Sequence, residues 1–149
     1  MTEVDQYWLR EAVELSRGCP PSATAFSVGA IILSAGGEVL ATGYSREGDP
    51  RDHAEEAALA KIAGIRLAGA TIYSSLEPCS ARASRPRSCT DLILAAGIAR
   101  VVFAWREPAI FVDCAGAETL REAGVEVVEI ADLADLVREV NAHLPKEAC

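Results

Sequence analysis

The chain has 149 residues, half of them hydrophobic, which excludes an intrinsically disordered protein and predicts one compact domain over residues 1–149. Its 14 Lys and Arg against 22 Asp and Glu give a formal net charge of −8, which argues against non-specific binding of nucleic acid or of an anionic membrane. No apolar run approaches the roughly 18 residues of a membrane span, and the acidic N-terminal stretch is unlike a secretory signal, so a cytoplasmic protein is expected.

The first third of the chain is predicted to form a helix and a β-hairpin. Apolar residues at helical spacing indicate a helix over residues 7–16, which Gly18 ends. Residues 26–33 and 39–44 are apolar or β-branched and flank a turn at residues 35–38. They are therefore predicted to pair as an antiparallel hairpin.

Helices and strands alternate through the rest of the chain, which gives the overall order α-β-β-α-β-α-β-α-β-α. Asp52 is placed to cap a helix from His53 to about residue 62. Later strands are predicted at residues 70–76, 101–105 and 125–130, and later helices at residues 89–96, 116–123 and 131–143. This alternation predicts a largely parallel sheet with helices on both faces.

The five cysteines form an odd set in a chain without an export signal, which argues against a disulfide framework. Cys19, Cys114 and Cys149 belong to no ligand pattern and are expected to be free thiols. His143, far along the chain from the other histidine, is expected on the surface.

The remaining cysteines belong to a pattern with metal-binding chemistry. His53 opens a predicted helix, Cys79 follows a predicted strand after Pro78, and Cys89 opens the next helix. One histidine and two cysteines suit a three-ligand zinc site whose fourth position stays open for water, and zinc lowers the pKa of such a water to about 7. Glu55, two residues after His53, is expected beside the metal as a proton shuttle rather than as a ligand.

Each part of this pattern has a simpler interpretation when taken alone. His53 could be a surface histidine, and Cys79 and Cys89 could be buried apolar residues. Glu55 and Glu56 could be a solvated acidic pair that complements the dipole of a helix. The joint pattern, His-x-Glu followed by Pro-Cys and a further Cys at strand-to-helix junctions, is the signature of zinc deaminases, and it favours the catalytic interpretation.

Three blocks of sequence carry a family likeness: SLEPCS at residues 75–80, CTDLI at 89–93 and AAGIARVV at 95–102. They resemble the cytidine deaminase superfamily, and within it the pyrimidine deaminase of riboflavin biosynthesis, from about residue 7 to residue 130. The resemblance implies an α/β fold of three layers, α/β/α, in which a mixed five-stranded sheet contains the antiparallel hairpin. It also implies a Zn²⁺ ion on His53, Cys79 and Cys89, Glu55 as proton shuttle, and hydrolytic replacement of an exocyclic amine by oxygen.

The substrate implied by the closest likeness is the diaminopyrimidine ribosylamino phosphate of riboflavin biosynthesis. The sequence departs from that family in three places. The family's His-His-Gly-Arg-Thr-Pro-Pro loop is replaced by residues 80–88, which contain no histidine, and Ala25-Phe26-Ser27 replaces Pro-Asn-Pro. The sequence also stops where the bifunctional enzymes continue into a reductase domain, so a deaminase domain alone is expected. Cytidine, deoxycytidine or dCMP is therefore an alternative substrate, and a non-catalytic zinc-containing binding protein is an alternative of another class.

The loop between the two cysteines carries Arg82, Arg85 and Arg87. These side chains could form a solvated surface loop, or they could clamp the phosphate of a substrate, because the arginine fork matches phosphate geometry. The expected partner is a small pyrimidine, with a phosphate if the arginines form such a clamp, and not a nucleic acid or a membrane. By resemblance alone, a homo-oligomer (a dimer or a tetramer) is also expected.

Three further residues are candidate substrate contacts. Ser27 and Ser45 lie at hairpin positions where the family approaches the substrate ring. Glu77 precedes Pro78-Cys79 and is expected either to accept a hydrogen bond from the substrate or to brace the loop of metal ligands, and bracing is favoured.

Overall fold

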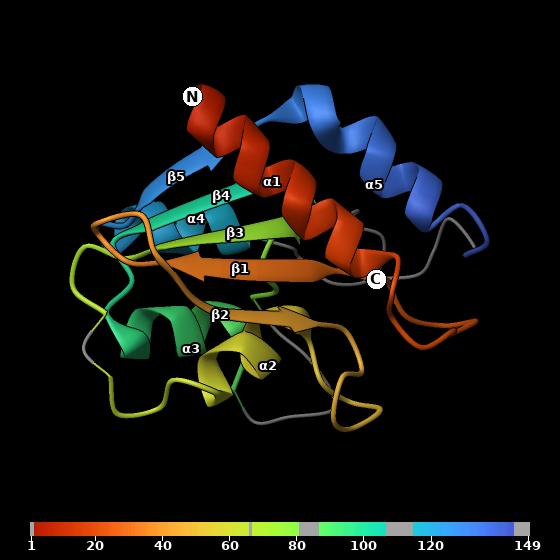
Figure 1. The fold of residues 1–149 in the computed structure, drawn as a ribbon, viewed down its shortest axis with the longest axis horizontal. Helices are drawn as coiled ribbons and strands as arrows, with labels where there is room; N and C mark the ends of the chain where they lie inside the picture. The colour runs from red at the N-terminus through yellow and green to blue at the C-terminus, as the bar shows by residue number, and fades with distance from the viewer. Residues whose placement is uncertain (1, 66, 81–86, 107–114, 145–149) are drawn as a thin grey trace.

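The computed structural model describes residues 2–65, 67–80, 87–106 and 115–144. Its centre is a five-stranded sheet in the order β2-β1-β3-β4-β5 (Figure 1). β1 runs antiparallel to both β2 and β3, whereas β3, β4 and β5 are parallel. The strands are β1 (Gly29–Leu33), β2 (Val39–Tyr44), β3 (Thr71–Leu76), β4 (Arg100–Trp105) and β5 (Glu126–Glu129). The mixed sheet with an antiparallel β1-β2 hairpin is therefore confirmed.

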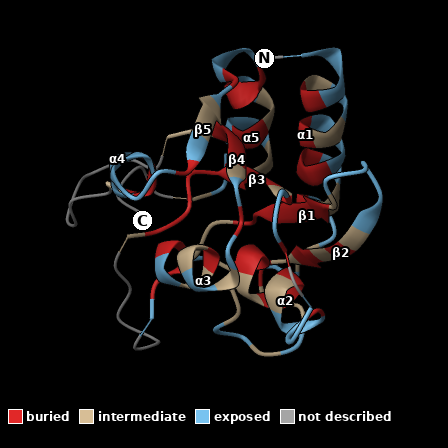
Figure 2. Cartoon of the chain, turned by 90° about the vertical axis from the view of Figure 1, so that its left-hand side faces the viewer, coloured by how far each residue is buried: buried red, intermediate tan, exposed pale blue. Residues whose placement is uncertain are grey.

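Helices cover both faces of the sheet. The helices are α1 (Glu3–Ser16), α2 (Ala54–Ala60), α3 (Cys89–Ala96), α4 (Gly116–Glu122) and α5 (Ala134–Val140), with a 3-10 turn, η1 (Ala131–Leu133), before α5. Figure 2 shows α1 and α5 side by side on one face, and α2 and α3 on the other. Each face has its own buried apolar cluster, so the molecule has two cores separated by the sheet. In the described ranges no helix combines the length and apolar character that crossing a bilayer requires.

The first helix begins earlier than its apolar stripe predicts. α1 starts at Glu3 rather than at residue 7, because Thr2 and Asp5 form a capping box. The Asp5 backbone N–H donates to Thr2 Oγ1 at 3.1 Å, and the Thr2 N–H donates to Asp5 Oδ2 at 3.3 Å. These bonds satisfy backbone donors that the first turn of a helix leaves free, so the helix extends beyond its buried residues.

Asp52 does not cap α2, contrary to expectation. Its Oδ2 accepts the backbone N–H groups of Gly48 and Asp49 at 3.2 and 3.0 Å, so the side chain closes the preceding turn instead. His53 is the N-cap residue of α2, and its backbone N–H donates to Glu56 Oε1 at 3.3 Å. The N-cap residue of α2 is thus a predicted metal ligand. His53 has the extended backbone conformation of an N-cap and lies directly before the first turn of the helix.

Two other predicted boundaries also shift. β1 begins at Gly29 rather than at residue 26, and the closing helix divides into η1 and α5 and ends at Val140. In both places long-range hydrogen bonds, described below, hold the residues that leave the regular element. Because β1 pairs with β3 in the register Ala30↔Ser74, the N-terminal end of β1 lies beside the C-terminal end of β3.

Candidate active site

Three predicted metal ligands meet at the carboxyl edge of the sheet. His53 precedes α2, Cys79 follows β3, and Cys89 is the first residue of α3. His53 Nδ1 lies 3.6 Å from Cys79 Sγ and 3.3 Å from Cys89 Sγ, and the three ligand atoms all lie within 4.8 Å of one another. Tetrahedral zinc with ordinary bond lengths needs nitrogen-to-sulfur separations of roughly 3.5 Å, so the donor set and its spacing fit zinc.

Local hydrogen bonds hold the two cysteines in place. The backbone N–H of Cys89 donates to Cys79 Sγ at 3.2 Å, and Thr90 binds the Cys79 carbonyl through its N–H and its hydroxyl. Ser88 and Asp91 form a capping box with two bonds of 3.1 Å, which sets the start of α3 at Cys89. The ligand loop is therefore fixed to the helix by backbone and side-chain bonds on both sides.

The two cysteine thiols strongly affect each other's protonation. Hydrogen bonds from Cys89 and His53 lower the pKa of Cys79 to about 4, against the effect of burial. The neighbouring Cys79, burial and the nearby Glu55 carboxylate raise the pKa of Cys89 well above its usual value. Two thiolates in contact in a buried place repel each other, so the second sulfur ionises readily only when a cation offsets the charge.

The Glu55 carboxylate lies beside this cluster. Glu55 is in the first turn of α2 and is only 4% exposed. The hydroxyl of Ser74, a fully buried residue of β3, lies 2.5 Å from Glu55 Oε1 and 2.8 Å from the Leu76 carbonyl, so its single proton can be donated to either oxygen. Sequence reasoning did not single out Ser74; the signal was a pair of serines within an otherwise apolar strand, because a buried hydroxyl needs a partner.

The Glu77 side chain links the loop that carries Cys79 to the start of α4. Its side chain is completely buried, and Oε2 accepts the backbone N–H of Ala117 at 2.9 Å. A second bond, from the N–H of Ala115 to Ser80 Oγ at 3.1 Å, joins the same two segments. Together these bonds attach the N-terminal end of α4 to the loop that carries Cys79.

Ser27 and Ser45 lie at the same edge of the sheet, and both hydroxyls have protein partners. Ser45 Oγ accepts the N–H of Val28 at 2.9 Å, and Ser27 Oγ accepts a bond from Arg46 Nη2 at 2.8 Å.

Of the three arginines in the loop between Cys79 and Cys89, the structure describes one. Arg87 is exposed, and its Nη2 lies 3.5 Å from the carbonyl of Asp91. Arg82 and Arg85 lie outside the described residues, as do Cys114 and Cys149.

Arg46 and Asn141 hold the segment before β1, a role that sequence reasoning missed. Arg46 has a positive φ of 63°, which is uncommon for a residue with a side chain, and its guanidinium donates to the carbonyls of Pro20 and Phe26. Asn141 Oδ1 accepts the Ser27 N–H at 2.7 Å, and its Nδ2 donates to the Ser27 carbonyl at 3.2 Å. Neither contact has a local sequence signal, because the partners are far apart in the chain.

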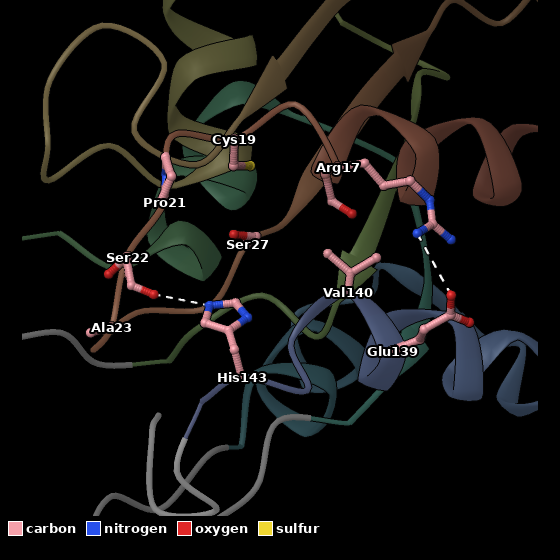
Figure 3. Close-up of a pocket in the computed structure, with 10 residues that line it drawn as sticks. Arg17, Cys19, Pro21, Ser22, Ala23, Ser27, Glu139, Val140 and His143 are labelled. Carbon is pink, nitrogen blue, oxygen red and sulfur yellow. Dashed lines mark hydrogen bonds and ion pairs between the residues drawn. The ribbon is translucent and has the colours of Figure 1, made fainter.

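A groove of about 710 Å³ lies where α1 and α5 end (Figure 3). Ser27 is among its lining residues, but none of the three predicted metal ligands is. The ring of His143, which is exposed as expected, donates from Nε2 to the Ser22 carbonyl at 3.0 Å across this groove. Cys19 also lines the groove as a free thiol.

Close packing of α2 on β2 sets the position of His53 and Glu55. A Cβ atom at Gly43 would lie 2.4 Å from the Ala54 carbonyl oxygen and 2.5 Å from the Ala58 nitrogen. Both are backbone atoms of α2 that cannot move alone, so Gly43→Ala is expected to displace the helix. We expect it to lower the free energy of unfolding by about 1–3 kcal/mol and to weaken zinc binding.

Urea unfolding and zinc titration measure both effects of Gly43→Ala. The matched control is Gly36→Ala in the hairpin turn, where the nearest atom to the new Cβ, Ser34 Oγ, lies 3.8 Å away. This control should change stability by less than about 0.5 kcal/mol. Equal stability and zinc affinity in the two variants would contradict the packing argument.

Comparison with known proteins agrees with this geometry. Residues 2–105 match the family model of the cytidine and deoxycytidylate deaminase zinc-binding region. The diaminohydroxyphosphoribosylamino-pyrimidine deaminase of Schizosaccharomyces pombe is 42% identical over an alignment of 148 residues, which covers 95% of this chain and 36% of that protein. The riboflavin biosynthesis protein RibD of Escherichia coli is 39% identical over 125 residues, 83% of this chain and 33% of the other. This chain thus spans about a third of the length of these curated relatives.

Solved structures agree with the fold. The Rib2 deaminase of Aspergillus oryzae, a C-terminal deletion mutant at pH 6.5, has a TM-score of 0.80 at 26% identity and covers 91% of this chain and 89% of its own. The same deaminase in complex with DARIPP has a TM-score of 0.74 at 25% identity, with 95% and 98% covered. The fold and the zinc cofactor expected from the sequence are confirmed, and the chain belongs to the family of cytidine and deoxycytidylate deaminases.

Proposed function

We propose that this chain is a hydrolytic deaminase that replaces the exocyclic amine of a small pyrimidine with oxygen and releases ammonia. One observation carries the proposal: the buried Glu55 carboxylate lies beside a cluster of one histidine and two cysteines that fits zinc. Within the described residues the cluster has three protein ligands, the number typical of catalytic zinc sites, whereas structural zinc sites have four. A carboxylate held at this place would have no purpose in a purely structural site.

In this proposal His53, Cys79 and Cys89 hold the zinc ion, and Glu55 moves the protons. Zinc, when bound, acts as a Lewis acid that activates water at neutral pH. Because the Ser74 hydroxyl binds Glu55 Oε1, proton transfer falls to Oε2. Glu55 accepts a proton from the attacking water and delivers it to the adjacent ring nitrogen. It then takes the second proton from the newly added hydroxyl and delivers it to the amine, which leaves as ammonia while the ring carbon keeps the oxygen.

The proposed substrate is the diaminopyrimidine ribosylamino phosphate of riboflavin biosynthesis. The names of the two relatives above and the DARIPP complex of a similar deaminase support this choice over a cytosine nucleotide. Arg82 and Arg85 are proposed as contacts to the phosphate, and Ser27, Ser45 and Glu77 as residues that shape the pocket. Their bonds to protein groups support an indirect role for these three.

The wider setting of the enzyme is also a proposal. We propose that residues 1–149 act as one deaminase domain, that the enzyme is a homo-oligomer, and that it works in the cytoplasm. Cys19 is a free thiol, and Cys79 and Cys89 are not joined in a disulfide, which suits a reducing compartment.

Ammonia release by the zinc-loaded protein tests the proposed function. The substrates to compare are the diaminopyrimidine with a ribosylamino or a ribitylamino phosphate side chain, cytidine, deoxycytidine, dCMP and cytosine. Turnover of a diaminopyrimidine phosphate alone is the expected result. Turnover of cytosine compounds instead would replace the proposed substrate, and no turnover with one zinc ion bound would contradict the proposed activity.

A further inference from the structure

Residues 26–28, the segment before β1, lie at the carboxyl edge of the sheet and are called the wall below. Phe26 packs edge-to-face against Trp105, the last residue of β4, with ring centroids 5.7 Å apart. The Trp105 carbonyl accepts the N–H of Glu77, which leads into the loop of Cys79. In open α/β sheets, ligands bind beyond the carboxyl ends of the parallel strands, so this wall borders the place where a substrate would lie.

Asn141 binds the backbone of this wall in the way a neighbouring strand would. Its Oδ1 accepts the Ser27 N–H at 2.7 Å, and its Nδ2 donates to the Ser27 carbonyl at 3.2 Å. Nδ2 also donates to the Val137 carbonyl at 3.0 Å, so the amide is anchored in α5. Asn141 and Ser27 are 5% and 7% exposed, so little water competes for these bonds.

A primary amide is the side chain that suits this task, because it offers an acceptor and two donors in one plane. The Asn141 amide binds only main-chain atoms of Ser27. The Ser27 hydroxyl accepts a separate hydrogen bond from Arg46. Arg46 also donates to the Phe26 carbonyl at 3.0 Å, from the opposite side of the segment. The wall is thus held between the loop after β2 and the end of α5.

We propose that Asn141 is a positioning residue of the substrate site: it fixes the backbone of Ser27, keeps the wall formed by residues 26–28 in place, and thereby sets the affinity for the aminopyrimidine. This inference rests on the proposed function for its substrate. The hydrogen bonds of the Asn141 side chain go to Ser27 and Val137 rather than to a predicted metal ligand, so removing its amide should change substrate binding without changing zinc content.

Asn141→Ala tests the role in binding. We expect KM to rise about tenfold with kcat and zinc content close to wild type, because the wall is displaced while Glu55 stays in place. Asn141→Asp keeps an acceptor for the Ser27 N–H but loses the donor to the Ser27 carbonyl, so an intermediate KM is expected. The matched control is Glu139→Ala on an exposed part of the last turn of α5, which should leave KM unchanged.

Hydrogen exchange measured by NMR gives a readout that does not depend on turnover. The Ser27 amide should lose protection in Asn141→Ala and keep it in Asn141→Asp and Glu139→Ala, while amides in the first turns of α5 stay protected in all three. Unchanged KM and unchanged Ser27 protection in Asn141→Ala would overturn the inference and leave the proposed function standing. If the wild-type protein turned over no substrate, the proposed function would fail, and protection at Ser27 would still decide whether Asn141 holds the wall.

Discussion

Replacing Glu55 with glutamine (Glu55→Gln) is expected to lower kcat by about 10²- to 10⁴-fold while the protein keeps its zinc. The amide has nearly the shape of the carboxylate and can still accept the bond that Ser74 donates to Oε1. It cannot take a proton from water at Oε2, so the proposed proton transfers stop. Steady-state ammonia release and the zinc content of the purified variant measure the two effects.

Glu56→Gln is the matched control for this substitution. Glu56 is the next residue of α2, and its Oε1 accepts the backbone N–H of His53 at 3.3 Å. Glutamine keeps an acceptor for that bond, so activity and zinc content should stay near wild type. Equal activity of Glu55→Gln and Glu56→Gln would remove Glu55 from the mechanism, and loss of zinc in Glu55→Gln would indicate that Glu55 supports the metal instead.

Arg100→Met is expected to lower the free energy of unfolding at pH 7 by about 3–5 kcal/mol. Asp5 is only 2% exposed and receives two hydrogen bonds from Arg100, at 2.7 and 2.5 Å, and one from the Tyr73 hydroxyl at 2.8 Å. Removing the guanidinium leaves a buried carboxylate without its counter-charge. Chemical unfolding measures the loss; Arg17→Met, which breaks an exposed pair with Glu14, should cost less than about 1 kcal/mol.

The effect of Arg100→Met should depend on pH. Hydrogen bonds from Arg100 and Tyr73 hold the pKa of Asp5 well below its ordinary value of 3.8, and burial with the Asp5 contact raises the pKa of Tyr73 to about 12. A carboxyl group with a lowered folded-state pKa stabilises the fold above its unfolded pKa, and this contribution is lost as the pH falls towards the folded value. In the variant, protonation of Asp5 removes the unpaired charge. The difference in free energy of unfolding between wild type and variant should therefore become smaller as the pH falls from 7 to 3. If this difference in free energy stayed constant from pH 7 to pH 3, Arg100 would not be the counter-charge of Asp5.

The sequence predicts the parts of this structure whose causes are local. The hairpin strands, and the helix that begins at Cys89 and ends at Gly97, follow from periodicity and from a glycine in the left-handed conformation. The three predicted metal ligands come together because each follows a strand or opens a helix at one edge of the sheet. The pattern of chemistry-bearing residues at such junctions is visible without a structure.

Other features depend on contacts that no local pattern encodes. Asp52 is of a residue type that often caps helices, but its carboxylate instead accepts the backbone N–H groups of Gly48 and Asp49 in the preceding turn. Ser27 is a candidate substrate contact by its place before the hairpin, but nothing in the local sequence indicates that the amide of Asn141 binds its backbone from 114 residues away. Such a pairing exists only after the last helix packs on the sheet, so neither periodicity nor propensity could predict it.

That distance along the chain also sets an order of events during synthesis. A nascent chain carries His53, Cys79 and Cys89 well before the ribosome reaches Asn141. The bond between Asn141 and Ser27 can form only after α5 has been synthesised, whereas all three predicted metal ligands precede α5 in the chain. The contact that holds residues 26–28 in place therefore depends on a residue that is synthesised after all three predicted metal ligands.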